Sequence, residues 1–247
     1  MENKVDQSQN DFEEEESYTV SVQSTLLLTK NYCLRKEEYS TIQKGNDLCP
    51  SIINVVFSLL QQISNDCFFV SELFSNKILN GTNIPLLKTN IFKYSVVMLP
   101  IFFNNAWFLC CVSITNKVLS FVGLRSDASQ IDEWKENILN WFESIAARLK
   151  EYFRRLEWNC FDMSRTEVEG TVDSGIYILL TSCRIASNYC YYLYKSDDCD
   201  YFRQALNGSL KNGFLPSIEA VSVDEGEIRL GFEKGIELLL DMQNNHH

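Results

Sequence analysis

The chain has 247 residues, of which 45% are hydrophobic and 22% are charged, and its formal net charge is −11 at pH 7. This length and composition indicate a globular protein with a substantial core. An acidic chain gains nothing from counterion release on DNA or RNA and is repelled by an anionic membrane surface, so we expect neither nucleic acid nor a membrane as a partner. The longest apolar runs, such as Val96–Phe103, are also too short to span a bilayer.

The nine cysteines are spread from Cys33 to Cys199, and none belongs to a C-x-x-C pair. An odd number without paired spacing argues against a disulfide framework and against a zinc site. Cys110 and Cys111 are adjacent, so in a strand they would face opposite sides. The first 20 residues are acidic and polar, unlike a signal peptide. We therefore expect free, buried thiols in a reducing, intracellular compartment, nuclear or cytoplasmic, with no metal and no cofactor.

The N-terminal part of the chain changes character near residue 18. Residues 1–17 are polar and end in the run Glu13–Glu16, which predicts a disordered acidic tail. The loosely alternating segment Thr19–Leu28 favours a strand. Apolar residues recur at helical spacing over Ile52–Ile63, and Pro50 lies where the first turn of a helix tolerates proline.

Strands and then helices follow along the rest of the chain. Tyr94–Leu99 is predicted to be a strand that stops at Pro100. Two further strands, joined by a turn over residues 115–117, predict a hairpin: Trp107–Ile114 and Val118–Val122. The predicted helices are Ile131–Leu156, a helix from Ser174 to Cys183, Asp200–Leu210 and Glu227–Met242. Together these elements predict a single α+β domain over residues 18–243.

Histidine is nearly absent from the sequence. The chain has two, His246 and His247, both at the extreme C-terminus. Cysteine and serine nucleophiles usually need an imidazole base within hydrogen-bond reach, and a frayed terminus is a poor place to hold one. This argues against a Cys-His or Ser-His hydrolase. Carboxylate pairs remain an alternative, because Asp and Glu total 33, although runs such as Glu13–Glu16 are typical of a solvated surface.

Three stretches, taken in chain order, resemble the SUMO-specific (ubiquitin-like) cysteine proteases, a papain-like family. Tyr39–Asn54 is similar to the family's entry motif, in which Trp-Leu-Asn-Asp precedes an Ile-Ile helix. Val96–Leu109 resembles a strand that ends in Pro-Ile and is followed by a His-Trp pair. Val172–Tyr177 resembles the motif Asp-Cys-Gly-(Ile/Val)-(Tyr/Phe), which places a nucleophile at a helix N-terminus. The resemblance implies an α+β fold with a central mixed sheet flanked by helices.

The same resemblance places the family's catalytic positions on residues that lack the required chemistry. The base position is Ala106, and the position of the acid that orients the base is Gly123. The nucleophile position is Ser174, and the glutamine of the oxyanion hole would fall near Val168. Without a base, the Ser174 hydroxyl is expected to be inert, and we predict that this residue serves as a helix N-cap.

The positions that hold the substrate's tail are only partly kept. In the family, a Gly-Gly tail lies in a tunnel roofed by two tryptophans. This chain has Trp107 at one of these positions and Asp47 at the other, and Pro50 replaces an aspartate of the entry motif. A carboxylate at Asp47 would repel the carboxylate of a C-terminal tail.

We therefore predict a catalytically inactive pseudoenzyme that acts as a protein–protein interaction or scaffold subunit of a larger complex. Two alternatives are a non-cleaving binder of SUMO or another ubiquitin-like protein, and a hydrolase with an unrecognised active site. The tyrosine-rich stretch after the Ser174 helix provides a candidate partner surface, at Tyr191 and Tyr192, because tyrosine is favoured in interfaces. Packing of these tyrosines against the predicted helix Glu227–Met242 is the structural alternative.

Overall fold

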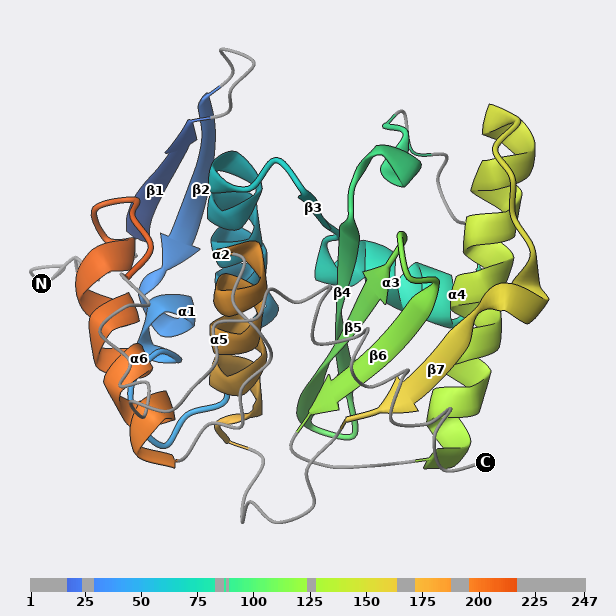
Figure 1. Cartoon of the computed structure of the whole chain (residues 1–247). Coiled ribbons are helices and arrows are strands. Elements are labelled where there is room, and N and C mark those ends of the chain that lie inside the picture. Colours follow the sequence, from blue (N-terminus) through green and yellow to red (C-terminus); the bar gives the residue numbers. More distant parts are fainter. Residues whose placement is uncertain are drawn as a thin grey trace, which may run out of the picture.

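The computed structural model describes residues 17–23, 29–82, 87, 89–123, 128–163, 172–187 and 196–216. Its centre is a five-stranded sheet in the order β3-β4-β5-β6-β7 (Figure 1). The strands are β3 (Cys67–Phe69), β4 (Val96–Phe103), β5 (Ala106–Ser113), β6 (Val118–Gly123) and β7 (Asn159–Asp162). The central strand β5 is antiparallel to both β4 and β6, and the two outer strands run parallel to their neighbours, so the sheet is mixed.

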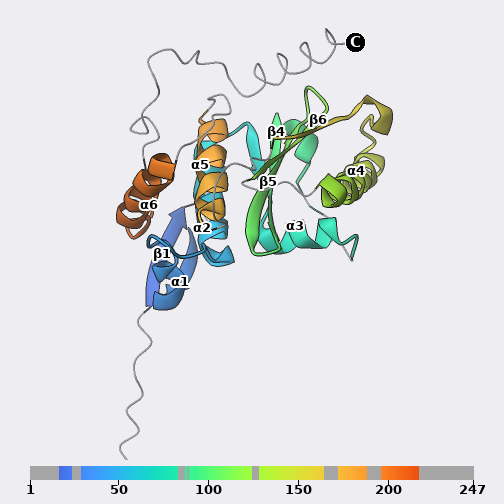
Figure 2. The same cartoon turned by 90° about the horizontal axis from the view of Figure 1, so that it is seen from below.

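Helices cover both faces of this sheet, as the two views show (Figures 1 and 2). The α-helices are α1 (Lys36–Ser40), α2 (Pro50–Ile63), α3 (Glu72–Leu79), α4 (Ala128–Leu149), α5 (Ser174–Ala186) and α6 (Ser196–Leu210). Short 3-10 turns are η1 (Ile91–Lys93) and η2 (Arg155–Glu157). Helices α2 and α5 lie on one face, and α3 and α4 on the other. A two-stranded antiparallel sheet, β1 (Ser17–Gln23) and β2 (Thr29–Arg35), lies beyond α2 together with α6.

All eight residues of β5 are buried, because the strand has a core on each face. Trp107, Leu109 and Cys111 belong to the cluster shared with α2 and α5. Alternate residues of the strand, including Phe108 and Cys110, belong to the cluster shared with α3 and α4. The adjacent cysteines therefore face opposite sides of the sheet, as their positions in the sequence predict.

A predicted strand and the long predicted helix end at other residues than expected, each for a local reason. Strand β4 continues through Pro100, which lies opposite Leu109 of β5. Its pairing with β3 ends at Met98, so a proline beyond that point removes no bond between these two strands. The long helix ends at Leu149 rather than at Leu156, because Lys150 has φ 57° and the left-handed backbone turns the chain away from the helix axis.

A side chain, rather than another strand, closes the outer edge of β3. The Nε2 group of Gln61 donates to the carbonyl oxygen of Cys67 at 3.0 Å, and its Oε1 accepts from the N–H of Phe69 at 3.0 Å. The amide thus occupies the hydrogen-bonding groups that a further strand would use.

Candidate functional site

The nucleophile position of the family resemblance, Ser174, is the first residue of α5 and is only 1% exposed. Its Oγ accepts a hydrogen bond from the backbone N–H of Trp107 at 3.0 Å. The N-cap of the helix is Asp173, so the prediction that Ser174 caps the helix is wrong. The hydroxyl instead connects the start of α5 to β5.

Trp107 is fixed next to Ser174 by close packing. Its indole Nε1–H donates to the carbonyl oxygen of Leu48 at 2.9 Å, and the side chain is 1% exposed. Gly175 allows this approach, because a Cβ there would lie 2.8 Å from the Cβ of Leu48 and 3.0 Å from Cδ1 of Trp107. A side chain at position 175 would push α5 away from the sheet.

The two positions that would hold a peptide tail differ in exposure. Asp47 is on the surface, whereas Trp107 is buried. The ring of Phe102 lies beside Trp107, with 4.9 Å between the ring centroids, and is itself partly exposed. Trp107 is thus buried while its aromatic neighbour Phe102 remains accessible to solvent.

The base and acid positions, Ala106 and Gly123, both lie within the apolar core on the α4 side of the sheet. Ala106 is buried in the cluster that contains Phe108 and Trp134. Gly123 is paired with Phe108 across β5 and β6. A Cβ on Gly123 would lie 2.6 Å from Cδ1 of Phe108, closer than real atoms approach. An ionised pair at these positions would have to enter a region made of aromatic rings.

A buried arginine fixes the loop that precedes Ser174. Arg203 of α6 is 2% exposed, and its Nη2 lies 2.8 Å from Oδ1 of Asp173. The guanidinium also donates to carbonyl oxygens of five residues: Thr41, Ile42, Gln43, Asn46 and Val172. One side chain thus joins α6, the loop after α1 and the start of α5.

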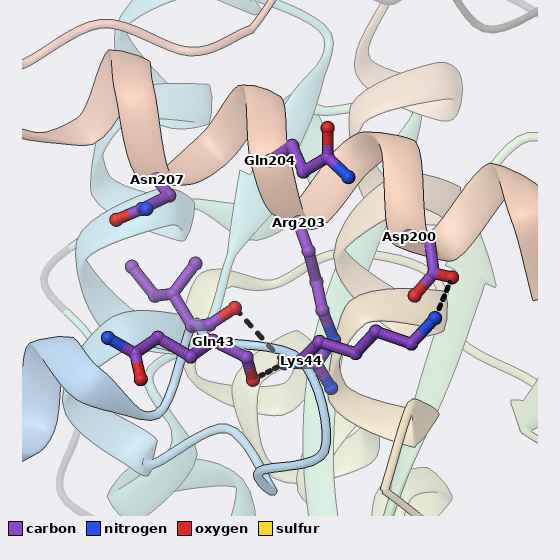
Figure 3. Close-up of a pocket in the computed structure, with 7 residues that line it drawn as sticks. Gln43, Lys44, Asp200, Arg203, Gln204 and Asn207 are labelled. Carbon is purple, nitrogen blue, oxygen red and sulfur yellow. Dashed lines mark hydrogen bonds and ion pairs between the residues drawn. The ribbon is translucent and has the colours of Figure 1, made fainter.

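A pocket of about 210 Å³ opens beside Arg203, between α6 and the loop after α1 (Figure 3). Its lining is polar: Gln43, Lys44, Asp200, Gln204 and Asn207, with Ile42 and Arg203. Lys44 reaches across to Asp200 and forms an ion pair at 2.5 Å. All three nitrogens of Arg203 already donate to protein groups, so the pocket offers an anion little beyond Lys44.

Among the described residues, the cysteines whose thiol pKa is raised by full or partial burial provide no alternative nucleophile. Burial raises the pKa of Cys183 to about 12 and that of Cys160 to about 11, and it raises the pKa of Cys110 and Cys111 as well. These thiols stay protonated at neutral pH, and a protonated thiol is a poor nucleophile. Among the described residues, no group of three or more His, Cys, Asp or Glu could hold a metal ion.

Several predicted positions lie outside the described residues. These are Val168, the tyrosines Tyr191 and Tyr192, the helix Glu227–Met242 and residues 1–16 of the acidic tail, whereas Ser17 begins β1. The described helices include none with the length and hydropathy of a membrane span.

Sequence reasoning missed the importance of two residues, Arg203 and Phe108. A signal for Arg203 existed, since it shares the apolar face of its helix with Cys199 and Leu206. A signal for Phe108 was the glycine inside the neighbouring strand, at position 123, because glycine within a strand often marks a close approach.

The same arrangement of strands and helices is found in solved structures of SUMO proteases. The C-terminal Ulp1 protease domain, in complex with Smt3, the yeast orthologue of SUMO, aligns with a TM-score of 0.64 and 12% identity over 79% of this chain and 88% of that chain. The chain has the fold of the SUMO proteases. The SUMO-protease fold and the α+β class predicted from the sequence are thereby confirmed, although identity this low shows the fold alone.

Two further structures of this fold agree. The catalytic domain of a Ulp1-like SUMO protease from Chaetomium thermophilum aligns with a TM-score of 0.55 and 14% identity over 78% of this chain and 82% of that chain. A Ulp1 structure whose catalytic cysteine is oxidised to a sulfinic acid aligns with a TM-score of 0.61 and 14% identity over 71% of this chain and 82% of that chain. No protein-family model and no curated protein matches the sequence.

Proposed function

We propose that this protein is a SUMO-protease-like pseudoenzyme that has no hydrolytic activity and works by binding another protein, as a scaffold or interaction subunit. The observation that carries the proposal is the environment of Ala106 and Gly123. Both positions lie in an apolar core beside Phe108 and Trp134, where a base and its orienting acid would have to be charged in the course of catalysis.

The nucleophile position supports the same proposal. Ser174 is buried, its Oγ already accepts the N–H of Trp107, and the only histidines of the chain are His246 and His247. A serine hydroxyl needs a neighbouring base to become a nucleophile. The related Ulp1 domain uses a catalytic cysteine, whereas this chain has no sulfur at the corresponding position of the resemblance.

A hydrolysis assay tests this proposal. The full chain is incubated with SUMO and ubiquitin-like precursors and with fluorogenic C-terminal amides, and an active SUMO protease serves as the positive control. We expect no turnover above background. Turnover that Ser174→Ala abolishes would overturn the proposal. Turnover that Ser174→Ala leaves unchanged would also overturn it, and would instead support a hydrolase with an unrecognised active site.

The alternative of a non-cleaving SUMO binder is less well supported by the tail-holding positions. Trp107 is buried against Leu48 and Phe102, and Asp47 presents a carboxylate where a tryptophan would roof the tunnel. Isotope-labelled SUMO titrated with the full chain should therefore keep its NMR spectrum. Shifts confined to the residues of the SUMO tail would favour the alternative instead.

We propose the partner surface at Tyr191 and Tyr192, because the stretch 189–194 is rich in tyrosine, a residue that is favoured in interfaces. Co-purification from the native extract should be lost for Tyr191→Ala and Tyr192→Ala while the melting temperature stays unchanged. If both variants unfold, or if both retain the partner, the binding surface lies elsewhere.

A further inference from the structure

We propose that Phe108 locks the acid position: any side chain at residue 123 destabilises the fold while Phe108 is present, and a smaller residue at position 108 removes this penalty. The inference deepens the proposed loss of catalysis and rests on it for its meaning. Its evidence, however, is steric and can be tested without an activity assay.

The lock lies in the pairing of β5 with β6. Phe108 and Gly123 are direct neighbours across these strands, and the Phe108 ring covers the glycine. A Cβ at position 123 would lie 2.6 Å from Cδ1, 3.1 Å from Cε1 and 3.4 Å from Cγ of that ring. Every residue other than glycine has a Cβ, so the first side-chain atom of an aspartate already clashes with the ring, before its charge is considered.

The ring has little room to move away. Phe108 is 2% exposed, and its centroid lies 5.5 Å from that of Trp134. Phe103 and Phe121 also pack against Trp134, at 5.3 Å and 6.0 Å between centroids. Because the other rings hold Trp134, displacing Phe108 would disturb the whole aromatic cluster rather than a single rotamer.

Backbone conformation does not explain why residue 123 is a glycine. Gly123 is not among the residues with positive φ, so its conformation is open to any residue. Glycine in a strand is unfavourable because it loses more conformational freedom on folding than other residues do. The remaining reason for glycine at this position is the space taken by Phe108, and an aromatic residue opposite a glycine is a known way to stabilise such a pair.

The test measures melting temperatures for Gly123→Ala, Phe108→Val and the double variant, all in the full chain. Gly123→Ala adds only a Cβ, and we expect it to lower the melting temperature by about 2–12 °C when Phe108 is present. Phe108→Val removes Cδ1 and Cε1, the two closest atoms. The double variant should therefore melt at the same temperature as Phe108→Val alone, or at a higher one, because the Cβ of residue 123 fills space that the ring has left.

Gly208→Ala is the matched control. Gly208 is exposed on α6, and a Cβ there would meet nothing within 4 Å. It should have the same small effect in both backgrounds, which separates the clash from the general effect of replacing glycine. If Gly123→Ala fails to fold, its recovery by Phe108→Val supports the lock. Equal losses from Gly123→Ala in the two backgrounds, or no loss in either, would overturn it, whether or not the protein proves inactive.

Discussion

Arg203 shows how much of the site's geometry depends on one side chain. Its buried guanidinium pairs with Asp173 and donates to carbonyl groups of two separate segments. Losing the arginine would leave a carboxylate and several carbonyl groups without their partner. Removal of one member of a buried ion pair costs about 3–5 kcal/mol, because the remaining charge is uncompensated.

We therefore expect Arg203→Met to lower the free energy of unfolding by about 3–5 kcal/mol, measured by urea denaturation. Lys44→Met is the control. Lys44 forms an ion pair with Asp200 nearby, but its side chain is 78% exposed, so its loss should cost about 0–1 kcal/mol. Equal effects of the two substitutions would show that the hydrogen bonds of Arg203 contribute little.

The buried thiol of Cys183 predicts a fall in stability at alkaline pH. Burial raises its pKa from the ordinary 9.0 to about 12 in the folded protein. Below pH 9 the thiol is protonated in both states and has no effect. Between pH 9 and 12 the unfolded chain loses the proton and the folded protein keeps it, so the free energy of unfolding falls by about 1.4 kcal/mol per pH unit for this thiol.

Cys183→Val isolates this contribution. Unfolding by urea under reducing conditions should give a constant difference between the variant and the wild type below pH 9. Above that pH the wild type should lose stability faster. Parallel curves up to pH 11 would mean that the thiol ionises in the folded state as readily as in the unfolded one.

Among the elements, β3 depends on a side chain from α2. Gln61 makes two hydrogen bonds to the backbone of β3, at Cys67 and Phe69. Gln61→Met should lower the free energy of unfolding by about 1–3 kcal/mol, because it leaves a donor and an acceptor unpaired. It should also increase light scattering at high protein concentration, because a strand edge is then open.

The neighbouring glutamine provides a matched comparison for this substitution. Gln62 has a buried Nε2 group without a hydrogen-bond partner among the described residues. Gln62→Met should therefore be neutral or slightly stabilising in the same denaturation experiment. A loss as large as that of Gln61→Met would show that replacing a glutamine of α2 by methionine is costly whether or not its amide is hydrogen-bonded, so the two bonds of Gln61 would not explain its effect.

The longer elements were predictable from the sequence because their apolar spacing is clear. The apolar stripe of Ile52–Ile63 and the hairpin around residues 115–117 are found within a few residues of their expected bounds. The short strands β3 and β7 were not predicted, since three or four residues cannot show a period. Their parallel pairing depends on contacts between distant segments, which local patterns do not encode.

The site was predictable in part. The family resemblance identified positions 106, 107, 123 and 174. It could not show that Ala106 and Gly123 lie in an aromatic core. The prediction that Ser174 caps α5 was also wrong, because Asp173 occupies the N-cap position and the Ser174 hydroxyl is bonded to Trp107. Which residues contact a given position depends on strand register and helix packing, so Phe108, Leu48 and Arg203 became visible only in three dimensions.

At the scale of the whole molecule, β5 belongs to both cores at once. Opening either face of the sheet would expose side chains of this strand, so neither core can unfold without weakening the other. We expect unfolding followed by fluorescence and by circular dichroism to give coincident transitions. Two separate transitions would show that the α2–α5 layer and the α3–α4 layer unfold independently.

The same strand has a consequence for the exchange of amide protons with solvent. The segment Leu109–Val112 is hydrogen-bonded between β4 and β6 and has no exposed side chain on either face. Its amides can exchange only when the entire sheet opens, so their deuterium uptake reports the free energy of global unfolding, whereas amides at the surface exchange through local fluctuations. Uptake in the peptide that spans residues 109–112 therefore provides a measure of total stability without any denaturant.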